Sequence, residues 1–269
     1  MKPRLLADMR RVGLGGEGVL RTRGRDAEAT AVIRAAITAG IGYFDCARAY
    51  DGSEEYHGAV WGSDVAARGH AFICSKSASR SAAGARRDLK TTLANMRVSR
   101  LDLWQIHDVR TDDDLLAITR PGGALEAFIE ARDAGVVSNI GVTGHHDPVV
   151  LLRAVQELPV STVLLPVNVV EGVLGGFMDR VLPEAHQRGI SVIGMKVLGG
   201  GMFTRAGLSA ETLLRWALRS AADVLIIGCS SPAEVTANVA TAAPLTDDEA
   251  RVLEERVRRD ARKLAYYRG

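Results

Sequence analysis

The chain has 269 residues, of which 47% are hydrophobic, and its 34 basic and 32 acidic side chains leave a net charge of +2. This length is typical of one domain with a single core, and the balanced charge excludes a polybasic surface for nucleic acid or a membrane. No apolar run reaches the ~20 residues that cross a bilayer, and the opening segment lacks the apolar centre of a signal peptide. These features favour a cytoplasmic protein that acts on small molecules.

Short apolar runs alternate with amphipathic segments along the chain, a pattern typical of parallel β–α units. Their apolar residues occupy both faces, as in strands that are covered by helices. A weak first strand is expected near 12–20, and seven clear strands follow at 42–47, 71–76, 101–107, 139–144, 162–168, 191–197 and 224–229.

Apolar residues at helical spacing predict a helix between successive strands. Thr246 and Glu249 have the spacing of a capping box for the last helix, Asp26 is a candidate N-cap, and Gly40 and Gly189 are candidate stops. The predicted helices are 27–39, 53–67, 81–97, 122–134, 147–157, 176–188, 209–221 and 247–264.

Eight such units without a break in composition predict one α/β domain over residues 1–269, a (β/α)8 TIM barrel with an additional C-terminal helix. An open doubly wound sheet stays an alternative, because counting strands does not establish closure.

No metal site is predicted. Cys46, Cys74 and Cys229 lie in apolar runs without the paired spacing of zinc ligands, so we expect buried thiols. His145 and His146 are adjacent on a loop, and such a pair rarely presents both rings to one ion without a third ligand.

Four polar residues fall at the carboxyl ends of strands two to four, where barrels build their chemistry: Asp45, Tyr50, Lys76 and His107. A free tyrosine has a pKa of about 10, and a nearby ammonium stabilises the phenolate. Lys76 is expected to supply that charge and Asp45 to keep Lys76 protonated. The set predicts a proton-transfer site.

The segments that carry these residues are similar to the aldo-keto reductase superfamily: GIGYFDCARAYDGSEEYHG (40–58), Ser75-Lys76 and LDLWQIHDV (101–109). The resemblance continues through 122–148, 189–201 and 228–235, and points to the branch with a Met-Lys and glycine-rich seventh strand. It implies an NADP(H)-dependent oxidoreductase that interconverts a carbonyl or sugar-like substrate and an alcohol, with Asp45, Tyr50, Lys76 and His107 as the catalytic tetrad.

The same resemblance implies a set of cofactor-binding positions. Cys46, Gly144 and Met195 depart from the usual family pattern, in which Thr, Asn and an aromatic residue are expected. The positions carried over are Thr143, Asn168, Lys196, Leu198, Gly199, Gly201, Gly228, Ser230, Ser231, Glu234 and Asn238.

The residues themselves indicate where a phosphate would bind. Gly199–Gly201 follow the seventh strand, and Ser231-Pro232 open a helix whose free N–H groups favour an anion. The motif GLGGEG (13–18) fits a turn at the barrel mouth better than a Rossmann fingerprint, because no helix follows it.

Glu234 leaves the choice of cofactor open. Many family members have a basic residue near this position for the 2′-phosphate of NADP. Ser-Pro-Ala-Glu (231–234) also has the spacing of a capping box without a cofactor role. The resemblance to the branch with a Met-Lys and glycine-rich seventh strand implies NADP, and Arg205 is a candidate for the cation that binds the 2′-phosphate. NAD stays possible.

Two other functions stay open: a nicotinamide-binding sensor with little turnover, and a Schiff-base lyase that uses Lys76. Because all four proposed catalytic residues belong to one chain, we expect a monomer to be sufficient for catalysis.

Overall fold

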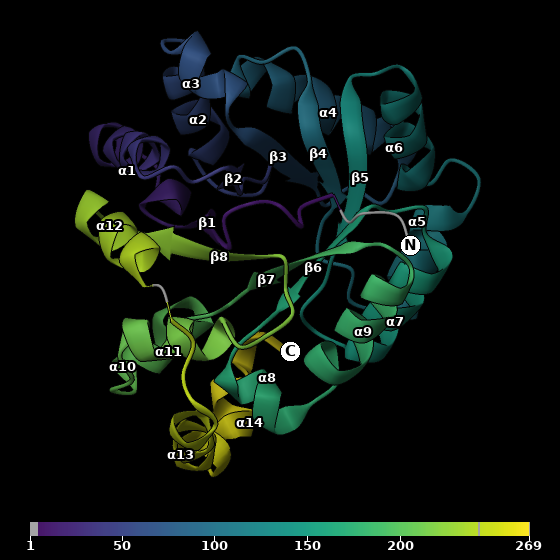
Figure 1. Ribbon diagram of the computed structural model, residues 1–269. Helices are drawn as coiled ribbons and strands as arrows, with labels where there is room; N and C mark the ends of the chain where they lie inside the picture. The colour runs from purple at the N-terminus through teal and green to yellow at the C-terminus, as the bar shows by residue number, and fades with distance from the viewer. Residues whose placement is uncertain (1–4, 242, 269) are drawn as a thin grey trace.

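The computed structural model describes residues 5–241 and 243–268; part of the opening segment, residues 1–4, lies outside them. The strands form a closed parallel barrel (Figure 1). Pairing of Val12 with Leu225 and of Leu14 with Ile227 joins the first strand to the last, so the alternative of an open sheet is wrong. The strands are β1 Val12–Gly18, β2 Tyr43–Phe44, β3 Phe72–Ser77, β4 Leu101–Ile106, β5 Val137–Thr143, β6 Thr162–Pro166, β7 Ser191–Met195 and β8 Val224–Cys229.

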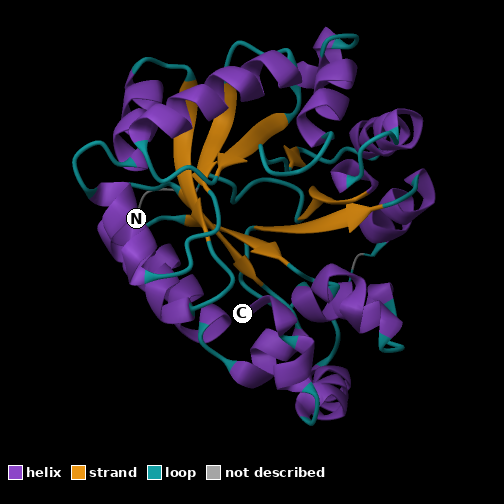
Figure 2. Cartoon of the chain, turned by 180° about the vertical axis from the view of Figure 1, so that it is seen from behind, coloured by secondary structure: helices purple, strands orange, loops and turns teal. Residues whose placement is uncertain are grey.

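Helices surround this barrel, and the strands lie in the middle of the view from behind (Figure 2). The helices are α1 Asp26–Thr38, α2 Ser53–Trp61, α3 Val65–Gly69, α4 Ala82–Met96, α5 Asp112–Thr119, α6 Ala124–Asp133, α7 Pro148–Glu157, α8 Val169–Leu174, α9 Leu182–Gln187, α10 Met202–Arg205, α11 Ala210–Ala217, α12 Pro232–Ala240, α13 Asp247–Arg258 and α14 Ala261–Leu264. Three short helices, α5, α8 and α10, are not among the helix ranges predicted from the sequence.

Three predicted helices are interrupted. The segment 53–67 divides into α2 and α3, because Asp64 begins a new helix by accepting from the Ala67 N–H. The segment 176–188 is a π-helical turn, η2 (Phe177–Val181), followed by α9. The final helix stops at Arg258 and resumes as α14 after Asp260.

The predicted helix ends are mostly confirmed. Gly40 and Gly189 have φ angles of 73° and 72°, the left-handed conformation of a helix stop, and Thr246 and Glu249 form the capping box of α13. The N-cap assigned to Asp26 is wrong. Asp26 is the first helical residue, where its charge suits the helix dipole, and no side chain caps α1.

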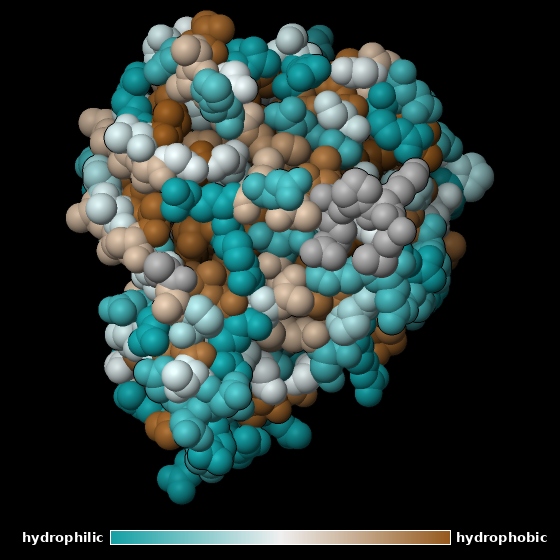
Figure 3. Space-filling view, in the orientation of Figure 1, coloured by the Kyte–Doolittle hydropathy of each residue, from teal (hydrophilic) through white to brown (hydrophobic). Residues whose placement is uncertain are grey.

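The apolar core has two layers. Side chains packed between strands and helices form the outer layer. The barrel interior is filled by Leu6, Tyr43, Cys74, Leu103, Leu164, Ile193, Met195, Val224 and Ile226. On the outside, hydrophilic residues are spread over the face seen in Figure 3 with hydrophobic residues interspersed. Within the described part of the chain, no helix is long and apolar enough to cross a membrane.

Candidate active site

The four predicted catalytic residues come from neighbouring strands. Asp45 follows β2 and its N–H donates to the Leu14 carbonyl, while Lys76 belongs to β3. Tyr50 lies in the turn before α2, and His107 directly follows β4, where its N–H donates to the Ser77 carbonyl. The barrel thus brings Lys76 into hydrogen-bond contact with both Asp45 and Tyr50, and places His107 against the tyrosine ring at 5.7 Å between centroids.

The Lys76 ammonium is completely buried and uses three hydrogen-bond acceptors. It donates to the Asp45 carboxylate at 2.8 Å, to the Cys46 carbonyl at 2.9 Å and to the Tyr50 hydroxyl at 3.3 Å. Three acceptors match the three protons of an ammonium group. Burial is the largest single effect and would lower the pKa of Lys76, but the Asp45 carboxylate together with Tyr50 and Cys74 raises the pKa overall. Lys76 is therefore a fixed cation.

The expected lowering of the Tyr50 pKa is wrong for the net shift. Burial raises the pKa of Tyr50 to about 12, which exceeds the lowering effect of Lys76, and the Asp45 carboxylate adds to the rise. The predicted contact between the Lys76 ammonium and the Tyr50 hydroxyl is confirmed, but the extent to which Tyr50 is desolvated could not be predicted from the sequence. Tyr50 is therefore a protonated hydroxyl at neutral pH.

His107 is held as a neutral ring. Burial, with a further contribution from the nearby Lys76 charge, lowers its pKa to about 3. Its Nδ1 is buried and has no hydrogen-bond partner among the described residues. The imidazole packs edge-on against Tyr50, at 83° between the ring planes. A neutral ring beside the tyrosine hydroxyl is suited to orienting a polar group of a bound molecule.

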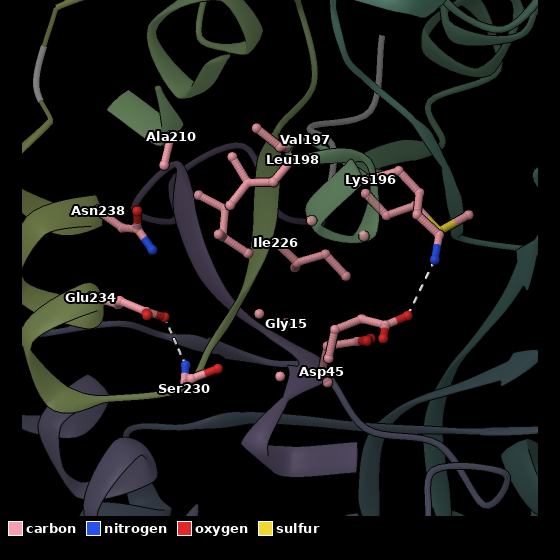
Figure 4. Close-up of a pocket in the computed structure, with 18 of the residues that line it drawn as sticks. Gly15, Asp45, Lys196, Val197, Leu198, Ala210, Ile226, Ser230, Glu234 and Asn238 are labelled. Atoms are coloured by element: carbon pink, nitrogen blue, oxygen red, sulfur yellow. Dashed lines mark hydrogen bonds and ion pairs between the residues drawn. The ribbon is translucent and has the colours of Figure 1, made fainter. Parts of the chain in front are cut away.

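A cavity of about 560 Å³ is lined by Asp45 and Tyr50, whereas Lys76 and His107 lie outside its lining. Asp45 lies on one side of the cavity, and Ser230, Glu234 and Asn238 lie on the other (Figure 4). This volume is within the range of small-molecule sites. Of the predicted cofactor positions, the cavity is lined by Lys196, Leu198, Gly201, Gly228, Ser230, Glu234 and Asn238.

The other predicted cofactor positions lie outside that lining. The Thr143 hydroxyl accepts from the Asp108 N–H at 2.7 Å. The Asn168 side chain caps α8 and bonds the Tyr267 hydroxyl. Gly199 accepts from the Tyr266 hydroxyl, and Ser231 caps α12 through the Glu234 N–H. Each of these groups is already bonded within the protein.

The sequence analysis gave no ligand role to the GLGGEG segment, yet Gly15, Gly16, Glu17 and Gly18 line the cavity. The segment belongs to strand β1, with a register shift between Gly15 and Gly18, so the prediction of a turn is wrong. A Cβ on Gly16 would lie 2.5 Å from the Tyr50 ring, and a Cβ on Gly15 would lie 2.8 Å from the Gly228 nitrogen. The signal was the clustered glycines, whose missing side chains leave room for close approach.

Two carboxylates line the cavity as well. Glu17 pairs with Lys196 at 3.1 Å and with Arg21 at 3.0 Å. Glu234 accepts from the Ser230 N–H at 2.7 Å, as Figure 4 shows. The predicted capping box would place the Glu234 carboxylate on the Ser231 N–H. The carboxylate instead accepts from the N–H of the preceding residue, Ser230, which lines the cavity. Backbone glycines and the Glu17–Lys196 pair thus line the same cavity.

The closed barrel thus places a buried Lys–Asp pair against a tyrosine at the lining of a cavity of small-molecule size. Residues 11–212 match the profile of the aldo/keto reductase family. The chain belongs to this family, which places it among the oxidoreductases.

Solved structures show the same fold. An aldo/keto reductase from Klebsiella pneumoniae in complex with NADP and acetate aligns with a TM-score of 0.75 and 21% identity, covering 93% of this chain and 92% of that one. An aldo-keto reductase, AKR11C1, from Bacillus halodurans in its holo form has a TM-score of 0.75 and 20% identity, with both chains covered completely. No curated protein matches the sequence.

Proposed function

We propose that the protein is an NADP(H)-dependent carbonyl reductase in which Tyr50 is the general acid. The observation that carries this proposal is the Tyr50 hydroxyl, which contacts the buried Lys76–Asp45 pair at the lining of a cavity of small-molecule size. NADP is favoured because a family member of the same fold was crystallised with it.

When bound, the nicotinamide supplies a hydride to the carbonyl carbon. The developing alkoxide is a stronger base than a phenolate, so Tyr50 transfers its proton to the carbonyl oxygen. Lys76 then stabilises the phenolate electrostatically until solvent restores the proton. His107 holds the carbonyl oxygen near Tyr50, and in the reverse direction the phenolate removes the alcohol proton.

Backbone groups of Gly201 and Gly228 line the cavity and would hold the pyrophosphate region, whereas the Ser230 N–H is already donated to Glu234. The Glu17 carboxylate also lines the cavity. Its repulsion of the pyrophosphate is offset, because Lys196 and Arg21 balance its negative charge. The residues present fit an extended nicotinamide dinucleotide.

A fluorescence titration with NADPH and NADH, followed by a panel of aldehydes, ketones and sugars, tests this function. We expect saturable binding and cofactor oxidation with at least one carbonyl. Saturable binding without turnover on any member of the panel would favour the sensor, and absence of binding would contradict both.

The Schiff-base lyase is disfavoured by the same geometry. All three protons of Lys76 are donated, and its raised pKa keeps it charged and non-nucleophilic. Borohydride trapping with candidate aldehydes should give no covalent adduct at Lys76, and an adduct detected by mass spectrometry would revive this alternative.

A further inference from the structure

Three ligand atoms converge outside the cavity just described. Asp108 lies in the loop between β4 and α5, and His145 and His146 lie in the loop between β5 and α7. Helices α5 and α7 lie side by side in Figure 1. The Asp108 Oδ1 atom is 3.2 Å from His145 Nε2 and 3.4 Å from His146 Nε2. The fold supplies the third ligand that the adjacent histidines lack in sequence.

The position of the His145 proton leaves a nitrogen lone pair facing the Asp108 carboxylate. His145 Nδ1 is 2.7 Å from the Tyr267 carbonyl oxygen, which only accepts, so Nδ1 carries the proton. In the neutral ring, Nε2 is then a bare acceptor aimed at a carboxylate oxygen. Asp108 Oδ1 and His146 Nε2 are also buried without a hydrogen bond among the described residues. One cation at their centre would satisfy all three.

The spacing fits a tetrahedral ion. Zinc binds nitrogen at about 2.0–2.1 Å and carboxylate oxygen at about 2.0–2.2 Å, so neighbouring ligand atoms of a tetrahedron lie about 3.3 Å apart. The two separations from Asp108 Oδ1, 3.2 and 3.4 Å, lie on either side of this value, and all three ligand atoms lie within 4.8 Å of one another. Two histidines and one carboxylate leave a fourth position for water, as in open zinc sites.

The surroundings fix these side chains. The Tyr267 carbonyl orients the His145 ring, as outer contacts of metal ligands usually do. Arg110 holds the other Asp108 oxygen, Oδ2, through its Nε at 2.8 Å and Nη2 at 2.6 Å, which leaves Oδ1 free for a single bond to an ion. Asp108 also has a φ angle of 58°, an uncommon conformation for a residue other than glycine.

We propose that Asp108, His145 and His146 form a binding site for a divalent transition-metal ion of the Zn²⁺ type, next to His107 and separate from the cavity. This departs from the prediction that the protein binds no metal. The ion would tie the loops after β4 and β5 together and, through Tyr267, to the C-terminal segment.

Co²⁺ binding tests the site without relying on activity. Protein without a histidine tag, freed of metal by a chelator, is titrated with Co²⁺ and then with Zn²⁺. We expect one equivalent of Co²⁺ with the intense visible absorption of a tetrahedral complex, which Zn²⁺ bleaches. His146→Gln and Asp108→Asn should each weaken binding by at least about tenfold.

His70→Gln is the matched control, because His70 is exposed at the end of α3. It should bind Co²⁺ as the wild type does, and thermal unfolding checks that every variant is folded. Absence of a tetrahedral complex in the wild type, or equal binding by the His146 and Asp108 variants, would overturn the proposal. Equal weakening by His70→Gln would show surface binding only and would overturn it too.

Discussion

His57 is a buried imidazole whose protonation opposes folding. It packs against the rings of Phe44 and Trp61, and its Nδ1 donates to the Ser53 carbonyl. Burial lowers its pKa from 6.5 to about 4. Between these values the unfolded chain binds more protons, so stability falls as the pH falls through this window.

We therefore expect wild-type unfolding free energy to drop more steeply between pH 6.5 and 4 than that of His57→Phe, by up to about 3 kcal/mol. Denaturant unfolding across this range measures it. A slope remains in the variant, because burial also lowers the pKa of His107. Identical slopes in the two proteins would mean that His57 is not held neutral.

Two roles are open for Glu234, capping of helix α12 and selection of the cofactor, and a charge substitution separates them. Its carboxylate bonds the Ser230 N–H and lines the cavity, where it would repel the 2′-phosphate of NADP. Glu234→Arg should raise the NADPH-to-NADH affinity ratio by about tenfold or more, since a repulsive charge becomes an attractive one. Fluorescence titration measures the ratio, and Glu234→Gln serves as the uncharged control. An unchanged ratio in Glu234→Arg would leave Glu234 as a cap alone.

At the scale of elements, Glu54 fastens α2 to the barrel beneath the site. It is fully buried and accepts from Thr92 Oγ1 at 2.6 Å and from Ser75 Oγ and Asn95 Nδ2, each at 3.0 Å. Ser75 precedes Lys76, and α2 begins three residues after Tyr50. The carboxylate thus connects the two segments that position the proton donor.

Glu54→Ala should lower the unfolding free energy by about 3 kcal/mol or more, because buried donors lose their acceptor. It should also reduce kcat by loosening the turn that holds Tyr50. Glu55→Ala is the control, since Glu55 is exposed and surface changes usually stay within about 0.5 kcal/mol. Equal thermal stability of the two variants would contradict this account of Glu54.

The elements themselves were largely predictable from sequence. The buried strand β8 is a continuous apolar run, and the left-handed glycines Gly40 and Gly189 mark where helices stop. What could not be predicted depends on contacts distant in sequence. The approach of Asp108 to the two histidines requires β4 and β5 to be neighbours, and the sign of the Tyr50 shift depends on burial.

At the scale of the whole molecule, the proposed site is complete in one chain. Asp45, Tyr50, Lys76 and His107 come from consecutive units of a barrel that closes on itself. A monomer isolated by size exclusion should therefore turn over substrate. Mixing the inactive variants Tyr50→Phe and His107→Ala should not restore activity, and substantial complementation would mean that chains share residues in the site.

In the proposed reaction, Tyr50 gives its proton to the carbonyl oxygen. A single-turnover measurement of NADPH oxidation, with wild type and Tyr50→Phe on the best substrate, tests it most directly. A positioned general acid contributes about 10²–10⁴-fold, so the variant should be slower by that factor while its NADPH affinity is unchanged. Lys76→Met should slow the same step, and His107→Gln should raise KM as well. A wild-type rate of hydride transfer in Tyr50→Phe would contradict the assignment and make His107 the leading proton donor.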